Sequence, residues 1–131
     1  MSIGDRVVVR VSRLVDPSVV IGTSTAIVDD VLEADEALAS RFRLVGRDVT
    51  AATTLALTTS DDLALAIPRA TGAQVEHLET HGAAVACAAA GIPFVALLAV
   101  ANFVGASGRI EWREHHRRVE DVLGEAVAAL L

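Results

Sequence analysis

An asparagine that directly follows an uncharged apolar run is the first residue whose position indicates chemistry. Residues 94–101 read FVALLAVA, and Asn102 comes next. Such a run predicts a strand that is buried on both faces, as in the centre of a parallel sheet. Ligands of open α/β folds bind beyond the carboxyl ends of the strands, so Asn102 and Phe103 are candidate ligand contacts. The alternative is that Asn102 only turns the chain.

Histidine and cysteine supply the other side chains that often carry chemistry. His77 and His81 are four residues apart, and His115 and His116 are adjacent. No third ligand stands at a spacing typical of a metal site, and adjacent helical residues point in different directions. We therefore expect no metal and no cofactor, and we interpret the histidines as surface or partner contacts. Cys87, within an Ala-rich segment, is interpreted as a small packed residue.

Strands and helices must alternate along the chain to position these residues. β-Branched and apolar runs predict strands over residues 5–11, 18–28, 49–58 and 94–101. Capping residues and helical spacing predict helices over residues 32–42, 63–70 and 114–131, and an Ala-rich helix that ends near residue 90. This alternation indicates an α/β fold, a three-layer αβα arrangement with a mainly parallel central sheet. We expect one domain over residues 1–131.

Composition excludes several classes of protein. The 131 residues are 53% hydrophobic and carry a formal net charge of −6, which argues against disorder and against a nucleic-acid partner. A single cysteine excludes a disulfide scaffold. Residues 83–101 are uncharged over a length that can span a membrane, but Gly91-Ile92-Pro93 interrupts them. The N-terminus lacks the pattern of a signal peptide, so we expect no membrane contact and a cytoplasmic location.

The longest motif region is VEHLETHGAAVACAAAGIPFVALLAVANFVG, residues 75–105. It resembles the signature of the nucleoside phosphorylase and nucleosidase superfamily: a V-E-M-E-type segment, an Ala-rich helix, G-[IV]-P-F, and a strand that ends in S-D or S-N. Gly4 and Asp5, the valines that follow and Asp16 are similar to the G-D-V-V run of the same superfamily. The resemblance extends over almost the whole chain. It implies the carboxyl-terminal half of a nucleoside phosphorylase-like fold.

The same resemblance implies a purine nucleoside site. Glu79 falls at the position of the ribose-binding glutamate, and Asn102 at that of the purine-contacting Asp or Asn. Leu78 replaces the methionine that packs under the sugar, and His77 replaces the first glutamate of the segment, so both are candidate substrate contacts. The F-V-G after Asn102 and the downstream Trp112 resemble futalosine hydrolases more than adenosine-type nucleosidases.

The chemistry of N-glycosidic cleavage gives these residues separate roles. Positive charge develops on the ribose, and a carboxylate that binds the sugar hydroxyls, here Glu79, can strengthen those bonds as it develops. Asn102 cannot transfer a proton, but its amide can donate hydrogen bonds to the departing base. An amide donor suits the exocyclic oxygen of a 6-oxopurine. We therefore predict a hypoxanthine- or guanine-type nucleoside, as in futalosine or inosine.

The first half of the superfamily fold has no counterpart in this sequence. In full-length relatives that half brings a Gly-rich loop and the acid–base residue that activates water. No G-x-G loop precedes Gly4, so we expect a second polypeptide to supply that half, and the chain to be one subunit of a split purine nucleosidase. The alternatives are a non-catalytic subunit for assembly or nucleoside binding, and a chain that is active alone as a homo-oligomer. Hydrolysis and phosphorolysis both stay open.

Overall fold

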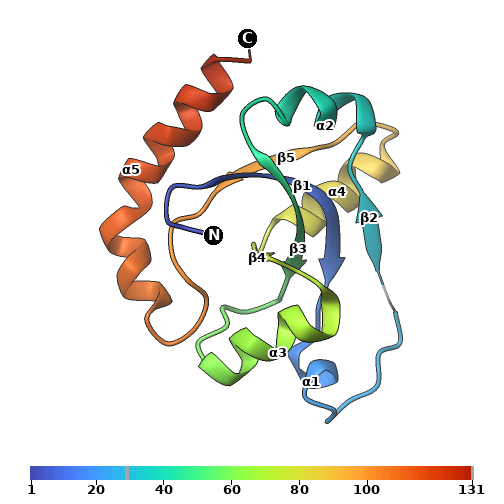
Figure 1. The fold of residues 1–131 in the computed structure, drawn as a ribbon. Helices are drawn as coiled ribbons and strands as arrows, with labels where there is room; N and C mark the ends of the chain where they lie inside the picture. The colour runs from blue at the N-terminus through green and yellow to red at the C-terminus, as the bar shows by residue number, and fades with distance from the viewer. Residues whose placement is uncertain (29, 131) are drawn as a thin grey trace.

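The computed structural model describes residues 1–28 and 30–130, in which helices flank a central sheet (Figure 1). The strands are β1 (Arg6–Leu14), β2 (Val31–Glu33), β3 (Arg47–Thr53), β4 (Val75–Glu76) and β5 (Ala96–Ala99). The helices are α1 (Pro17–Val20), α2 (Glu36–Phe42), α3 (Asp61–Thr71), α4 (Thr80–Ala89) and α5 (Gly108–Ala128). The predicted α/β class, with helices layered on a sheet, is confirmed. Within these residues, every helix is too short or too polar to cross a membrane.

Strand β1 organises the sheet because it pairs along both of its edges. On one edge it runs parallel to β3, and β4 then pairs in parallel with β3. On the other edge it pairs antiparallel with β5 over its first half and with β2 over its second half. Val7 and Val8 near the start of β1 are fully buried, so the strand with most pairing partners also lies deepest in the core.

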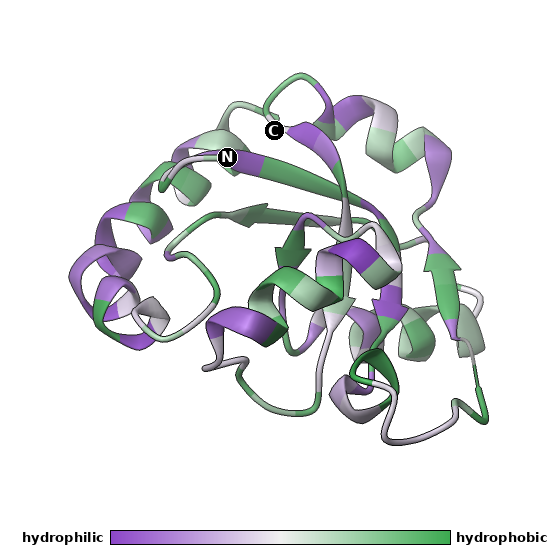
Figure 2. Cartoon of the chain, turned by 60° about the horizontal axis from the view of Figure 1, so that its bottom comes forward, coloured by the Kyte–Doolittle hydropathy of each residue, from purple (hydrophilic) through white to green (hydrophobic). Residues whose placement is uncertain are grey.

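The expectation that residues 94–101 form a central parallel strand is wrong. β5 covers only Ala96–Ala99, runs antiparallel to β1, and pairs with no other strand of the described residues. All four of its residues are half-buried, and Figure 2 shows the strand as hydrophobic throughout. An apolar run determines that both faces of a strand are buried, but it determines neither the direction of the strand nor its neighbours.

Two capping aspartates explain two further differences from the predicted elements. The predicted strand over residues 18–28 is wrong, because Asp16 accepts a hydrogen bond from the Ser18 N–H at 2.8 Å and Pro17 begins a helical turn. Asp35 caps α2 through the Leu38 N–H at 2.9 Å, so residues 31–33 are free to form β2 instead of the predicted helix start. α5 begins six residues before the predicted 114, and the predicted last residue, Leu131, lies outside the described residues.

The core consists mainly of valine and alanine. One buried cluster joins the neighbouring strands β1 and β3, and its members are Val7, Val9, Val49 and Ala51. Val15, Ala52, Ile67 of α3 and Ala73 form a second buried cluster. Several larger side chains lie outside both clusters: Ile27 is 99% exposed and Leu55 is 89% exposed. The described chain therefore leaves much of its bulky apolar surface in contact with solvent.

Candidate active site

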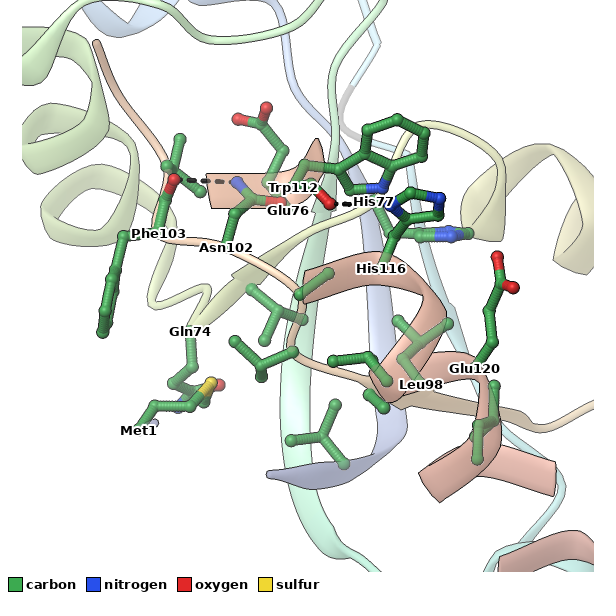
Figure 3. A pocket seen from close by; sticks show the side chains of 18 residues that line it. Met1, Gln74, Glu76, His77, Leu98, Asn102, Phe103, Trp112, His116 and Glu120 are labelled. Carbon is green, nitrogen blue, oxygen red and sulfur yellow. Dashed lines mark hydrogen bonds between the residues drawn. The ribbon is translucent and has the colours of Figure 1, made fainter. Parts of the chain in front are cut away.

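A cleft of about 360 Å³ separates α5 from the sheet (Figure 3). Its sheet side includes Glu76 and His77 at the end of β4 and Asn102 beyond the end of β5. Trp112 and His116 face them from α5. The cleft therefore combines polar side chains from two strand ends with an aromatic pair, which suits a planar polar ligand.

Asn102 and Phe103 both line the cleft, and a tight contact with α5 holds them there. The Asn102 Nδ2 donates a hydrogen bond to the Phe103 carbonyl at 2.8 Å. Gly108 lies against this pair: a Cβ at that position would stand 2.6 Å from the Phe103 oxygen and 2.9 Å from the Asn102 Nδ2. Glycine is therefore the residue that lets the first turn of α5 approach the Asn102 side chain.

Two carboxylates fasten the loop between β5 and α5. Glu111 accepts hydrogen bonds from the Ser107 hydroxyl at 2.6 Å and from the Phe103 N–H at 2.8 Å. The hydrogen bond from the Ser107 hydroxyl is the main reason that the pKa of Glu111 lies below its usual range. The hydrogen bond from the Phe103 N–H lowers this pKa further. Asp61 at the start of α3 accepts a hydrogen bond from the Ala106 N–H at 2.9 Å. The loop that carries Asn102 is thus tied to two helices.

Glu76 is a cleft residue to which the sequence reasoning gave no role. Its carboxylate accepts hydrogen bonds from the Thr58 hydroxyl at 2.7 Å and from the Thr58 N–H at 3.2 Å. Thr58 follows β3, so Glu76 joins the segment after β3 to the end of β4. Its place in the V-E-H run, directly before His77, was the sequence signal that could have identified it.

The predicted sugar-binding residues lie at the edge of this site. His77 lines the cleft, and its Nδ1 lies 2.7 Å from the Thr80 hydroxyl. Leu78 and Glu79 do not line the cleft, and the Glu79 side chain is 74% exposed. The Glu79 carboxylate lies 3.5 Å from the His77 Nε2 and makes no capping bond to α4. The structure therefore brings Asn102, Phe103 and His77 together and leaves Glu79 available to solvent beside them.

Buried polar contacts anchor the first turn of α4, directly after Glu79. His81 is only 3% exposed, so its interpretation as a surface or partner contact is wrong. Its N–H donates to the Thr53 hydroxyl at 3.1 Å, and its Nδ1 lies 3.1 Å from the Ser12 hydroxyl. The His81 Nε2 is 3.1 Å from an Asp30 oxygen, an ion-pair distance without hydrogen-bond geometry. These contacts fix the start of α4 to β1 and β3.

His116, the second histidine of the cleft, takes part in an aromatic contact. No group of three His, Cys, Asp or Glu side chains in residues 1–28 and 30–130 is arranged to hold a metal ion. His116 instead stacks on Trp112, with ring centroids 4.4 Å apart. The four-residue spacing of Trp112 and His116 on a helix was the sequence signal for this pair.

Neither a family model nor a curated protein matches the sequence, but solved structures do. The 5′-methylthioadenosine/S-adenosylhomocysteine nucleosidase of Helicobacter pylori superposes over 99% of this chain with a TM-score of 0.81 and 13% identity. Futalosine hydrolase of H. pylori superposes over 99% of the chain with a TM-score of 0.81 and 14% identity. The chain has the nucleosidase fold. A Streptococcus pyogenes S-adenosylhomocysteine nucleosidase covers 100% of it, with a TM-score of 0.74 and 20% identity.

This chain corresponds to only part of each solved nucleosidase-fold structure. The chain spans 61% of the length of the H. pylori methylthioadenosine nucleosidase, 60% of the futalosine hydrolase and 62% of the S. pyogenes enzyme. The predicted fold resemblance is therefore confirmed over nearly the whole of this chain. The activities that give those proteins their names are not transferred by the fold alone.

Proposed function

We propose that this chain is one subunit of a split purine nucleosidase that cleaves the N-glycosidic bond of a 6-oxopurine nucleoside. The observation that carries this proposal is the position of Asn102 and His77, from two strand ends, in one cleft of a nucleosidase fold. The exposed Glu79 carboxylate beside His77 is free to accept hydrogen bonds from the ribose hydroxyls. A second polypeptide supplies the part of the fold that carries the group that activates water.

The contacts of Asn102 support an oxygen-bearing base. One N–H of its amide is bonded to the Phe103 carbonyl, so the other N–H is the donor that remains for a ligand. A donor pairs with the exocyclic oxygen of hypoxanthine or guanine, whereas the amino group at the same position of adenine is itself a donor. The stacked Trp112 and His116, on the opposite wall of the cleft, offer an aromatic surface for the ring.

The direct experiment expresses the chain alone and together with the product of an adjacent reading frame. Release of the base from futalosine, inosine and methylthioadenosine is then measured alongside the native mass. We expect release only from the two-chain complex, with futalosine or inosine preferred. Full activity of the isolated chain would contradict the split enzyme, and a preference for methylthioadenosine would contradict the role given to Asn102.

Two substitutions test the proposed roles within that complex. Glu79→Gln should lower kcat/KM on the order of a hundredfold, because a neutral amide stabilises the developing positive charge less than a carboxylate does. Glu125→Gln, the same change on the exposed part of α5, is the matched control and should leave kcat/KM unchanged. Asn102→Asp restores a group that can carry a proton, and should shift preference toward adenine nucleosides. Equal losses of kcat/KM for Glu79→Gln and Glu125→Gln would contradict the proposed role of Glu79.

A non-catalytic nucleoside-binding subunit is the second candidate function. Two observations favour it: Glu79 does not line the cleft, and one donor of Asn102 is already bonded within the loop. A complex that binds inosine by calorimetry but releases no hypoxanthine from it would support this alternative. A complex that binds no nucleoside would leave only a role in assembly.

A further inference from the structure

The composition of β5 does not suit its position in the sheet. Residues 95–100 read VALLAV, with no charged side chain and no proline. Edge strands are normally protected from pairing by charges, prolines or bulges, and runs that are apolar on both faces belong inside sheets. β5 nevertheless pairs only with β1 among the described strands, and every residue of it is half-buried. A further strand beside β5 would remove this mismatch.

The hydrogen-bond pattern identifies the groups that such a strand would meet. The Val100 N–H donates to the Asp5 carbonyl at 2.9 Å, so Val100 points its backbone groups toward β1. Backbone direction alternates along an antiparallel pair, so Leu98 and Ala96 also point toward β1. The N–H and C=O groups of Leu97 and Ala99 therefore point away from β1. No described strand pairs with these backbone groups, so Leu97 and Ala99 form the open edge of β5.

We propose that the open edge of β5 is the docking site for an extended segment of the second polypeptide, which adds a strand to the sheet beside Leu97 and Ala99. This inference rests on the proposed split enzyme and names the surface that joins its two parts. The solved nucleosidase-fold proteins support this occupant, since each contains a region with no counterpart here. Docking at β5 also places the partner next to Asn102, three residues beyond the strand.

Hydrogen exchange followed residue by residue tests the edge without any substitution. In the isolated chain the amides of Leu97 and Ala99 should exchange much faster than those of Leu98 and Ala96, which bond to β1. Addition of the adjacent reading-frame product should slow Leu97 and Ala99 by at least about a hundredfold. Slow exchange of both amides in a monomeric isolated chain would show that the edge is already covered and would overturn the proposal. So would a complex in which the two amides stay unprotected.

A proline variant tests the same edge by binding. Ala99→Pro removes an outward N–H and leaves the bonds to β1 in place, because proline is tolerated where the N–H faces away from the partner strand. It should raise the Kd of the complex on the order of tenfold to a hundredfold, since a partner carbonyl loses its donor. Ala99→Val keeps the N–H and is the matched control. An unchanged Kd for Ala99→Pro, with native exchange at Leu98, would refute the docking edge.

The result distinguishes this edge from the proposed activity. A complex that protects Leu97 and Ala99 but releases no base supports the docking site and contradicts the nucleosidase. A complex that releases base while both amides exchange freely does the reverse. A doubled native mass of the isolated chain, with both amides protected, would assign the edge to a second copy and overturn the proposed occupant.

Discussion

Replacing Gly108 with alanine is expected to disturb the site although no proposed ligand-binding residue is itself substituted. The new Cβ would lie 2.6 Å from the Phe103 carbonyl oxygen and 2.9 Å from the Asn102 Nδ2. The carbonyl belongs to the backbone, so α5 or the loop must shift to relieve the contact. Overpacking of this kind costs about 1–3 kcal/mol. We expect the same shift to move the Asn102 side chain away from its position in the cleft.

Gly124 offers a matched control on the same helix. A Cβ there meets nothing within 4 Å, and the residue is exposed in the interior of α5. Alanine in place of an exposed interior glycine should stabilise the helix by about 0.5–1 kcal/mol. The two glycine-to-alanine changes therefore differ by roughly 1.5–4 kcal/mol in their effect on unfolding. In a chain of this size that difference corresponds to roughly 5–15 °C in Tm.

The assay combines urea or thermal unfolding with nucleoside binding to the complex. Gly108→Ala should lower the free energy of unfolding and weaken nucleoside binding. Gly124→Ala should raise the free energy of unfolding and leave nucleoside binding unchanged. Equal stability of the two variants would refute the steric argument, because the chemical change is identical. If Gly108→Ala is destabilised but binds inosine with native affinity, the position of this loop does not determine nucleoside binding.

Two further predictions concern hydrogen bonds around the site. Because the folded pKa of Glu111 lies below its unfolded value, its contribution to stability is present above the unfolded pKa and is lost as the pH falls through the folded pKa. Fluorescence of the single tryptophan, Trp112, should report the loosened loop at acid pH, and Glu111→Gln should abolish that pH dependence. Ser12→Ala leaves the buried His81 Nδ1 without its neighbour and should cost about 1–3 kcal/mol in urea denaturation; a loss below about 0.5 kcal/mol would contradict that contact.

Local patterns in the sequence were sufficient for the elements whose ends carry capping signals. The predicted helix over residues 63–70 corresponds to α3, which Ser60 caps, and the Ala-rich helix predicted to end near residue 90 corresponds to α4, which ends at Ala89. The predicted strand over residues 18–28 is wrong because Asp16 before Pro17 caps a helical turn in a region rich in valine and isoleucine. Caps act within a few residues, so they are legible in sequence when the right donor and acceptor are considered.

The site residues divide in the same way. The local sequence around residues 94–103 predicted Asn102 and Phe103 as ligand contacts. In the structure both residues line the cleft, together with His77. The supports of that site were not predictable, because each joins segments that are distant in sequence. Asp61 reaches Ala106, and Glu76 reaches Thr58, through bonds that exist only when the sheet is assembled.

Residue patterns alone predicted the fold class, the resemblance to nucleosidases and the apolar character of residues 94–101. The fold class and the apolar run follow from local composition and spacing, whereas the resemblance depends on the motif of residues 75–105. The folded structure was needed to show that β5 pairs only with β1 among the described strands, antiparallel to it, and that Glu79 lies outside the cleft. Strand neighbours and cleft boundaries depend on which distant segments pair, and no local pattern specifies that choice.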